Sequence, residues 1–134
     1  MITKLIIYTD GGARGNPGPA AIGAVLTDEQ AKVVAEISQC IGEATNNQAE
    51  YRAVIAALEK AKELGAADLQ FFLDSELVVK QLKREYKVKN GELAPLFLRV
   101  HNLVVGFKKV SFEHVRREQN VEADRLVNSA LDGK

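Results

Sequence analysis

Apolar and polar positions along the chain follow two periodicities, one typical of strands and one typical of helices. Short runs rich in β-branched and aromatic residues predict five strands, over residues 4–10, 20–27, 32–39, 69–74 and 109–115. Apolar residues spaced three and four apart predict four helices, one that opens at Thr45 and others over residues 75–85, 93–107 and 120–131. Glycine and proline concentrate in residues 11–19, which predicts a turn between the first two strands.

The order of these elements predicts the fold class. Short loops join the first three strands, so we expect an antiparallel meander there, whereas helices separate the later strands and favour parallel pairing. The sequence thus predicts an α/β protein with a five-stranded mixed sheet and helices on both faces. No repeat, low-complexity tract or linker interrupts residues 1–134, which we expect to form a single domain.

Two acidic residues stand where strands are predicted to end. Asp10 closes the run LIIYT, and Asp74 closes the run LQFFL. If the two strands are parallel, both carboxylates emerge at the carboxyl edge of the sheet, where open α/β sheets bind ligands. An aspartate also commonly stops a strand and starts a turn, and this simpler interpretation suits either residue taken alone.

Two further acidic residues are predicted on the inward faces of helices. Thr45 and Gln48 form a capping-box pattern, which makes Glu50 the fifth residue of its helix, in line with the apolar stripe that faces the sheet. Asp124 borders the inward face of the last helix, although an acid near a helix start also suits the helix dipole. A buried carboxylate is normally paired, protonated or bound to a metal.

Four carboxylates at one edge of a sheet would form a binding site made of oxygen ligands. The chain has one cysteine and two histidines, so no cluster of thiolates or imidazoles competes as a metal centre. Oxygen ligands favour Mg²⁺, with Mn²⁺ as a substitute, and two such ions can clamp both oxygens of an in-line phosphoryl transfer. The residues alone therefore point to phosphoryl-transfer chemistry.

The distribution of charge narrows the class of substrate. Eighteen basic residues balance eighteen acidic residues, which argues against a protein that grips nucleic acid by its overall charge. Five basic residues against one acid crowd residues 80–89, however, and residues 99–117 hold a second basic run. Such runs are often solvated faces, but beside a carboxylate cluster they also fit a polyanionic substrate.

Four segments, taken in order, resemble a known family. They are YTDGGARGNPGPAAIGAVL, TNNQAEYRAVIAALE, FLDSELVVKQL and NVEADRL, and together they resemble a type 1 ribonuclease H almost from end to end. The resemblance implies a ribonuclease H-like fold that begins with three antiparallel strands. It also implies an endonuclease that hydrolyses the RNA strand of an RNA–DNA hybrid with two Mg²⁺ ions, leaving 5′-phosphate and 3′-hydroxyl ends.

The resemblance also assigns roles to particular residues. It places the family's four catalytic, metal-binding acids on Asp10, Glu50, Asp74 and Asp124. Asp10 would bridge both ions, Glu50 and Asp74 would hold the ion that activates water, and Asp124 would complete the other site. Contacts to the hybrid are implied for Gly11, Gly12, Asn16, Thr45, Asn46, Asn47, Gln48, Lys87 and Lys89.

Two departures from the family pattern concern binding and turnover. Many members carry a long basic protrusion with aromatic residues, where this chain has only KREYKVKNGE and no tryptophan, so we expect weaker hybrid binding. Members often place a mobile histidine ten residues before the last acid, and His114 has that spacing but falls in a predicted strand. Arg117, in the loop that follows, is our preferred residue for the phosphate or product-release role, with His114 as the alternative.

Two other functions remain compatible with such a fold. One is a non-catalytic module that binds hybrids, which the presence of all four acids disfavours. The other is a different nuclease, such as a junction resolvase or a transposase-like domain, which the segments TNNQAEY and DGGARGNPG disfavour. No apolar run approaches the roughly 18 residues of a membrane span. With one cysteine and no signal-peptide pattern, we expect a cytoplasmic protein that acts as a monomer.

Overall fold

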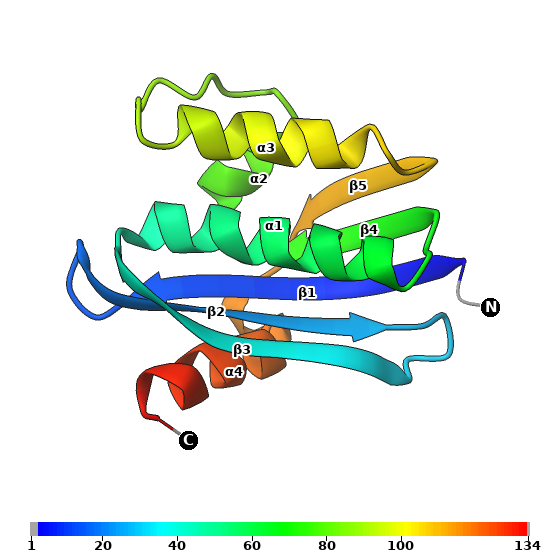
Figure 1. The fold of residues 1–134 in the computed structure, drawn as a ribbon, viewed down its shortest axis with the longest axis horizontal. Helices are drawn as coiled ribbons and strands as arrows, with labels where there is room; N and C mark the ends of the chain where they lie inside the picture. The colour runs from blue at the N-terminus through cyan, green and yellow to red at the C-terminus, as the bar shows by residue number, and fades with distance from the viewer. Residues whose placement is uncertain (1–2, 134) are drawn as a thin grey trace.

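A five-stranded sheet forms the centre of the computed structural model, which describes residues 3–133 (Figure 1). The strands are β1 (Lys4–Ala13), β2 (Gly18–Thr27), β3 (Val33–Ala44), β4 (Asp68–Leu73) and β5 (Lys109–His114). They lie in the order β3-β2-β1-β4-β5. β2 pairs antiparallel with both β1 and β3, whereas β4 pairs parallel with both β1 and β5. The predicted fold class and the predicted mixed sheet are therefore confirmed.

Helices cover both faces of this sheet. Within the described residues these are α1 (Asn46–Glu63), α2 (Glu76–Leu82), α3 (Ala94–Val104) and α4 (Val121–Leu131), with a short 3₁₀ helix, η1 (Arg117–Gln119), before α4. α1 packs on the central strands and on α3, whereas α4 packs against β2 and β3 from the opposite face (Figure 1). Among residues 3–133, no helix is both long enough and apolar enough to cross a membrane.

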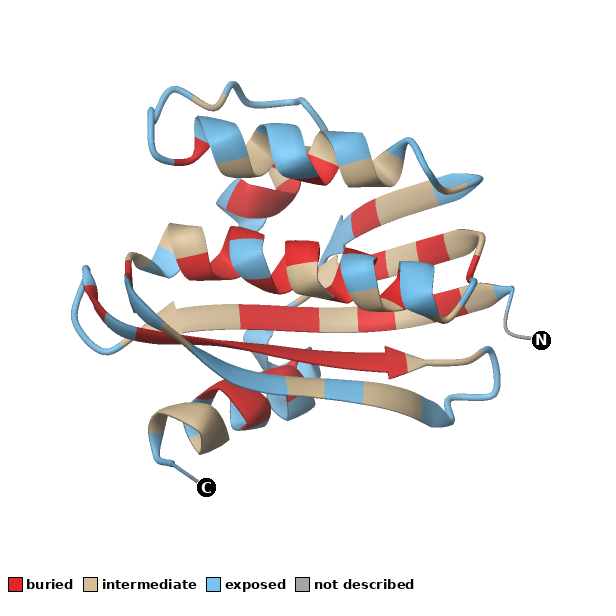
Figure 2. Cartoon of the chain, viewed as in Figure 1, coloured by how far each residue is buried: buried red, intermediate tan, exposed pale blue. Residues whose placement is uncertain are grey.

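The main hydrophobic core lies between α1 and the sheet. Tyr51 and Phe71 are its largest fully buried side chains. The Tyr51 hydroxyl donates a hydrogen bond to Gln81 Oε1 at 2.7 Å, which ties α1 to α2 inside this core. β2 is buried along most of its length, whereas β3, at the edge of the sheet, is largely exposed (Figure 2).

Two strands extend three or more residues beyond their predicted ends, whereas the other strand boundaries lie within two residues of the prediction. β1 does not end at Asp10 but continues to Ala13, because residues 10–13 pair with residues 20–23 of β2, and the turn shrinks to residues 14–17. β3 likewise runs on to Ala44, past a register shift opposite Ala20 and Ala21. The composition of residues 11–19 indicated a turn, but backbone pairing, which glycine tolerates, extends the ladder through Gly11 and Gly12.

Gly11 allows the closest approach between the sheet and α1. A Cβ atom at Gly11 would lie 2.2 Å from the carbonyl carbon of Ala49 and 2.5 Å from the Glu50 nitrogen. No side chain fits between β1 and the first turns of α1 at this point. The absence of a side chain at Gly11 therefore brings Glu50 next to the strand that carries Asp10.

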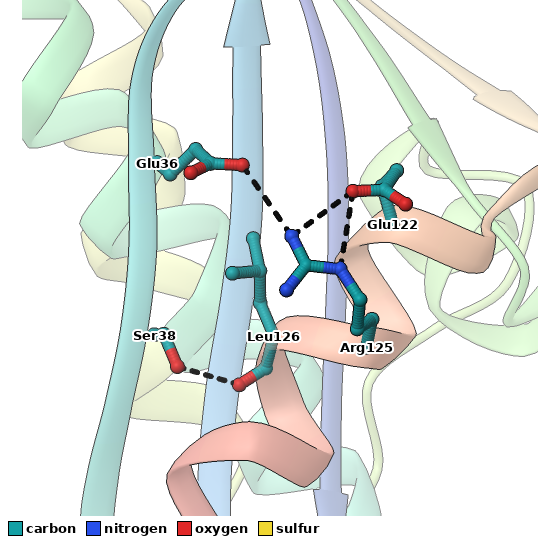
Figure 3. A network of polar contacts seen from close by, with 5 residues as sticks. All are labelled: Glu36, Ser38, Glu122, Arg125 and Leu126. Atoms are coloured by element: carbon teal, nitrogen blue, oxygen red, sulfur yellow. Dashed lines mark hydrogen bonds and ion pairs between the residues drawn. The ribbon is translucent and has the colours of Figure 1, made fainter. Parts of the chain in front are cut away.

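α4 is fastened to the other face by a second glycine and by polar contacts. A Cβ atom at Gly23 would lie 2.3 Å from the carbonyl oxygen of Ala123, so α4 rests on the main chain of β2. Ser38 Oγ donates a hydrogen bond to the Leu126 carbonyl oxygen at 2.6 Å (Figure 3). Arg125 lies between Glu122, at 3.0 Å, and Glu36 of β3, at 3.8 Å (Figure 3). These contacts fix α4, and with it Asp124, relative to the sheet.

Candidate active site

Three carboxylates converge at the carboxyl edge of the sheet. Asp10 lies in β1, Asp74 directly follows the parallel strand β4, and Glu50 is the fifth residue of α1. One carboxylate oxygen from each lies within 4.8 Å of the others. Asp10 and Glu50 are buried, whereas Asp74 is partly exposed. The sequence predicted this trio from strand ends and helix periodicity, and the structure brings it together.

Asp124 and Arg117 share an open groove with this trio. The groove has a volume of about 450 Å³ and takes in Gly11, Gly12, Asn46 and Asn47 as well as Asp10, Glu50, Asp74, Arg117 and Asp124. Asp124 lies outside the 4.8 Å trio but close enough to raise the pKa of Asp10. Nine residues predicted for catalysis or substrate binding therefore line one hollow, while their individual roles stay predictions.

The Glu50 carboxylate is held in place by backbone geometry. The Gly11 N–H donates a hydrogen bond to Glu50 Oε1 across the contact between β1 and α1. The predicted capping box is confirmed: Thr45 Oγ1 accepts from the Gln48 N–H at 3.1 Å, and Gln48 Oε1 accepts from the Thr45 N–H at 2.8 Å. Because the cap fixes where α1 begins, it also fixes the turn from which Glu50 projects.

Burial and neighbouring negative charge raise the pKa values of two of the acids. Burial is the main reason that the pKa of Asp10 is raised from 3.8 to about 7, and repulsion from Asp74 adds to it. Burial likewise raises the pKa of Glu50, with the Asp10 carboxylate as the second cause. Among residues 3–133, none of the four acids forms an ion pair with a basic side chain. The cluster therefore lacks the positive charge that would stabilise it in its ionised form.

Asn120 positions one of these acids, a role that sequence reasoning missed. Its side chain is buried, and Nδ2 donates to the Thr9 carbonyl oxygen at 2.9 Å and to Asp74 Oδ2 at 3.2 Å. Asn120 was predicted only as the start of the last helix, and it is in fact the residue that precedes α4. Its place four residues before Asp124 was the one available signal, because both would then face the same site.

The structure separates the two residues considered for the phosphate role. Arg117 begins η1 and its side chain lines the acidic groove. His114 is the last residue of β5, is exposed, and is absent from the lining of that groove. Alternation along the predicted strand places His114 on one face with Val110 and Phe112 and predicts that it packs there. This prediction is wrong, because His114 lies at the end of an edge strand, where its side chain is exposed to solvent.

A second hollow adjoins the groove at the start of α1. It has a volume of about 340 Å³ and is lined by Asn16, Thr45, Asn46, Asn47 and Gln48, together with Asn90, Glu92 and Leu93. Asn46 joins the two hollows, because its N–H donates to Asn16 Oδ1 at 3.0 Å and its Oδ1 accepts from the Ala13 N–H at 2.8 Å. The amides predicted to contact the hybrid thus form one connected surface.

Lys87 and Lys89 lie apart from both hollows. They are exposed in the segment that links α2 to α3 and line neither cavity. Asn90 and Glu92, which follow them, do reach the second hollow, and Gln48 Nε2 donates to Glu92 Oε2 at 3.3 Å. The basic segment is therefore linked to the start of α1 through Gln48 and Glu92.

The donor set of the acidic cluster fits divalent cations of the hard type. It offers only carboxylate oxygens, it is partly open to the groove, and it concentrates negative charge without a basic partner among the described residues. Asp10, Glu50 and Asp74 could hold one ion together, and Asp124 lines the same groove. The cluster is unsuited to zinc, which prefers nitrogen and sulfur ligands.

Comparisons with known proteins agree with this geometry. The family described as "Reverse transcriptase-like" matches residues 8–130. Ribonuclease HI of Halobacterium salinarum is 48% identical over 125 residues, which cover 93% of this chain and 63% of that protein. A bifunctional protein of Mycobacterium tuberculosis is 47% identical over 130 residues, which cover 96% of this chain and 36% of that protein. The chain thus spans about a third of the length of the first curated relatives it matches.

Solved structures show the same similarity in three dimensions. The crystal structure of RNase H1 from Halobacterium salinarum has a TM-score of 0.95 at 46% identity and covers 98% of this chain and 99% of that chain. LC11-RNase H1, isolated from compost, was solved in complex with an RNA/DNA hybrid. That complex has a TM-score of 0.92 at 46% identity and covers 96% of this chain and 97% of that chain.

Proposed function

The chain belongs to the type 1 ribonuclease H family, and from this premise we propose that it is an endonuclease that hydrolyses the RNA strand of RNA–DNA hybrids. The observation that carries the proposal is the convergence of Asp10, Glu50 and Asp74 within 4.8 Å, in a groove that Asp124 also lines. The hybrid bound to the similar LC11-RNase H1 supports the class of substrate. We propose that the products carry 5′-phosphate and 3′-hydroxyl ends.

We propose that the four acids hold two Mg²⁺ ions, with Mn²⁺ as a substitute. The all-oxygen donor set and the raised pKa values of Asp10 and Glu50 support this assignment, because cations would offset the burial and the mutual repulsion that raise these values. Bound there, such ions supply Lewis-acid polarisation of the phosphate and a water nucleophile at neutral pH. The protein's own contribution is to hold the carboxylates in position before substrate arrives.

That positioning comes from neutral hydrogen-bond donors. The Gly11 N–H orients Glu50, and Asn120 Nδ2 orients Asp74. Neither donor carries a charge, so both fix the carboxylates without neutralising them. Cations can therefore displace the protons that the raised pKa values favour on Asp10 and Glu50, and the carboxylates need little reorganisation during the reaction.

The remaining groove residues are suited to a nucleic-acid duplex. The amides of Asn46 and Asn47 and the backbone at Gly12 can contact 2′-hydroxyls and base edges in the wide minor groove of a hybrid. Arg117 can pair with a phosphate through two parallel hydrogen bonds at the rim of the acidic cluster. Lys87 and Lys89 would contact the phosphates of the DNA strand, farther from the acids.

A single chain supplies every residue of this site, so we propose that the protein acts as a monomer. Light scattering coupled to size-exclusion chromatography, at the concentration used for cleavage assays, tests that point. A dimer with full activity per site would contradict it.

The direct test of the function is cleavage of end-labelled substrates. We expect the protein with Mg²⁺ or Mn²⁺ to cut the RNA strand of an RNA–DNA hybrid and to leave a DNA duplex intact, with an RNA duplex as a further comparison. Ligation of a 3′-adapter before and after phosphatase treatment identifies the product ends. Cleavage of the DNA duplex, or intact hybrid with either ion, would overturn the proposal.

A further inference from the structure

A second groove, apart from the active site, lies between α3, the end of α2 and the edge strand β5. Its volume is about 500 Å³, and none of its lining residues belongs to the acidic groove. Its apolar lining consists of Leu82, Phe97, Val100, Val104, Val110 and Phe112. β5 is the last strand of the sheet on this side, so one edge of its backbone borders the groove unpaired with any described strand.

Arg84, at the rim of this groove, adopts a backbone conformation that arginine rarely takes. Its φ is +64°, in the left-handed region. The residue ends α2 in a Schellman motif: its N–H donates to the Gln81 carbonyl oxygen at 3.0 Å, and the Glu85 N–H donates to the Lys80 carbonyl oxygen at 2.8 Å. Glycine is the usual residue at this position because it adopts the left-handed conformation without strain. Arginine here costs stability, which suggests that its side chain has a function.

The Arg84 side chain meets a histidine rather than an acid. Its guanidinium donates to His101 Nδ1 on α3, on the same side of the groove. Among residues 3–133, no carboxylate lies within ion-pair distance of Arg84, whereas the neighbouring Lys83 pairs with Glu85 at 3.4 Å. Arg84 and His101 together therefore present hydrogen-bond donors and positive charge above an apolar surface. The carboxylate that lines the same groove, Glu113 of β5, forms no ion pair with Arg84 among the described residues.

We propose that this groove binds an acidic, apolar segment of a partner protein. One carboxylate of the segment would pair with Arg84 and His101, and the adjacent apolar side chain would lie on Phe97, Val104 and Phe112. The segment would run extended beside β5, whose free edge offers main-chain hydrogen bonds. Charge complementarity at the rim and apolar burial on the floor together identify this class of occupant.

The composition of the groove favours a peptide over a nucleic acid. A sugar–phosphate backbone gains little from a floor of six apolar side chains, and no exposed aromatic ring in this lining offers a stacking platform. Lys80 and Lys83, the other basic groups of α2 and its end, are already paired with Glu76 and Glu85. Arg84, by contrast, forms no ion pair among the described residues, so its guanidinium is available to a carboxylate of the partner.

The test uses fluorescence anisotropy with a fluorescein-labelled decapeptide centred on Glu-Glu-Leu-Leu and with its Gln-Gln-Leu-Leu counterpart. We expect saturable binding of the acidic peptide with a Kd on the order of 100 µM, typical of small transient interfaces. Arg84→Gly and Arg84→Asn both suit the left-handed backbone and should weaken binding about tenfold or more. Arg84→Gly should also raise the Tm by about 2–5 °C, because it relieves backbone strain.

The matched control is Arg99→Gln, which removes a positive charge from α3, the helix that carries His101, but lies in an ion pair with Glu59 outside the groove. It should leave peptide binding within about twofold of wild type. Equal binding of the glutamine peptide, unchanged binding by Arg84→Gly, or no amide shift changes at residues 97–104 with millimolar acidic peptide would each overturn the proposal. A rise in KM for the hybrid in Arg84→Gly, without any peptide binding by wild type, would assign the groove to nucleic acid instead.

Discussion

The buried amide of Asn120 joins the carboxylate of Asp74 to the main chain of β1. Asn120 Nδ2 lies 3.2 Å from Asp74 Oδ2 and 2.9 Å from the Thr9 carbonyl oxygen. One side chain therefore holds the Asp74 carboxylate at a fixed distance from the main chain of β1. Asp74, which follows β4, and Thr9, which precedes Asp10, are thereby linked through the residue before α4. The acidic cluster depends on this link as well as on the sheet itself.

Asn120→Ala should therefore lower both stability and turnover. Loss of the buried hydrogen bonds should cost about 1–3 kcal/mol of unfolding free energy, and a misplaced Asp74 should reduce kcat. Urea denaturation and steady-state cleavage measure the two effects. Ser38→Ala is the control, because it removes the 2.6 Å hydrogen bond to Leu126 on the same helix but touches no acid. Equal kcat values for the two variants would show that Asn120 is only structural.

Asp10→Asn should abolish hybrid cleavage and stabilise the fold when divalent ions are absent. The folded-state pKa of Asp10 is about 7 against an ordinary 3.8, so between these values the folded chain holds more protons than the unfolded chain. In EDTA, the part of wild-type stability that depends on Asp10 is therefore fully present below about pH 4 and is lost as the pH rises toward about 7. Asp10→Asn should not show this loss of stability with rising pH, and it should have a higher Tm than wild type at about pH 8.

Thermal melts from acid to mildly alkaline pH, with and without Mg²⁺, check whether stability changes with pH in this direction. Added Mg²⁺ should raise the Tm of wild type more than that of Asp10→Asn, because the variant lacks one ligand. A Tm for Asp10→Asn far below that of wild type in EDTA would mean that Asp10 is structural. Near-normal turnover of the variant would remove it from the catalytic assignment.

Lys87→Ala combined with Lys89→Ala should raise KM for the hybrid more than it lowers kcat. The dependence of binding on salt should also flatten, because fewer phosphate counterions are released. A matched control removes Lys62 and Lys108, two exposed lysines near the end of α1 and the start of β5, at the edge of the sheet opposite the acids. An identical salt slope for both double variants would place the hybrid away from residues 87–89.

Arg117→Ala should lower turnover by about 10–100-fold, or about 1.4–2.8 kcal/mol of activation free energy, with little change in Tm. The expectation follows from the position of Arg117 in the acidic groove and its exposure. His114→Ala should leave the Tm near that of wild type, because the side chain is exposed. Turnover of both variants across pH decides the assignment, and an active Arg117→Ala beside an inactive His114→Ala would reverse it.

Gly11→Ala should be strongly destabilising, whereas Gly12→Ala should be tolerated. A methyl group at Gly11 would overlap the main chain of Ala49. To make room for it, β1 and α1 would have to move apart, and Glu50 would move with α1. We expect a loss of about 3 kcal/mol or more. At Gly12 the nearest contact would be Val127 Cγ1 at 3.7 Å, an ordinary distance. Similar Tm values for the two variants would contradict the tight contact between β1 and α1.

The positions of the acids could largely be predicted from the sequence, whereas the contacts that hold them in place could not. Helix periodicity and the capping box placed Glu50 correctly, because local hydrogen bonds fix where α1 begins. The contact between Asn120 and Thr9 joins residues 111 positions apart, and no local pattern encodes it. Residues 11–13 were expected to leave the sheet, yet their pairing with β2 depends on a partner strand that composition alone does not show.

Gly11 and Gly23 together have a consequence for how the protein tolerates change in its interior. Asp10 and Gly23 are direct partners across β1 and β2, and Gly11 is the next residue along. α1 rests on one glycine and α4 on the other, from opposite faces, so main-chain atoms set the separation between Glu50 and Asp124. Larger or smaller core side chains elsewhere can therefore be exchanged during evolution while the spacing of the acids stays constant. Core composition can in this way vary without changing the geometry of the acidic cluster.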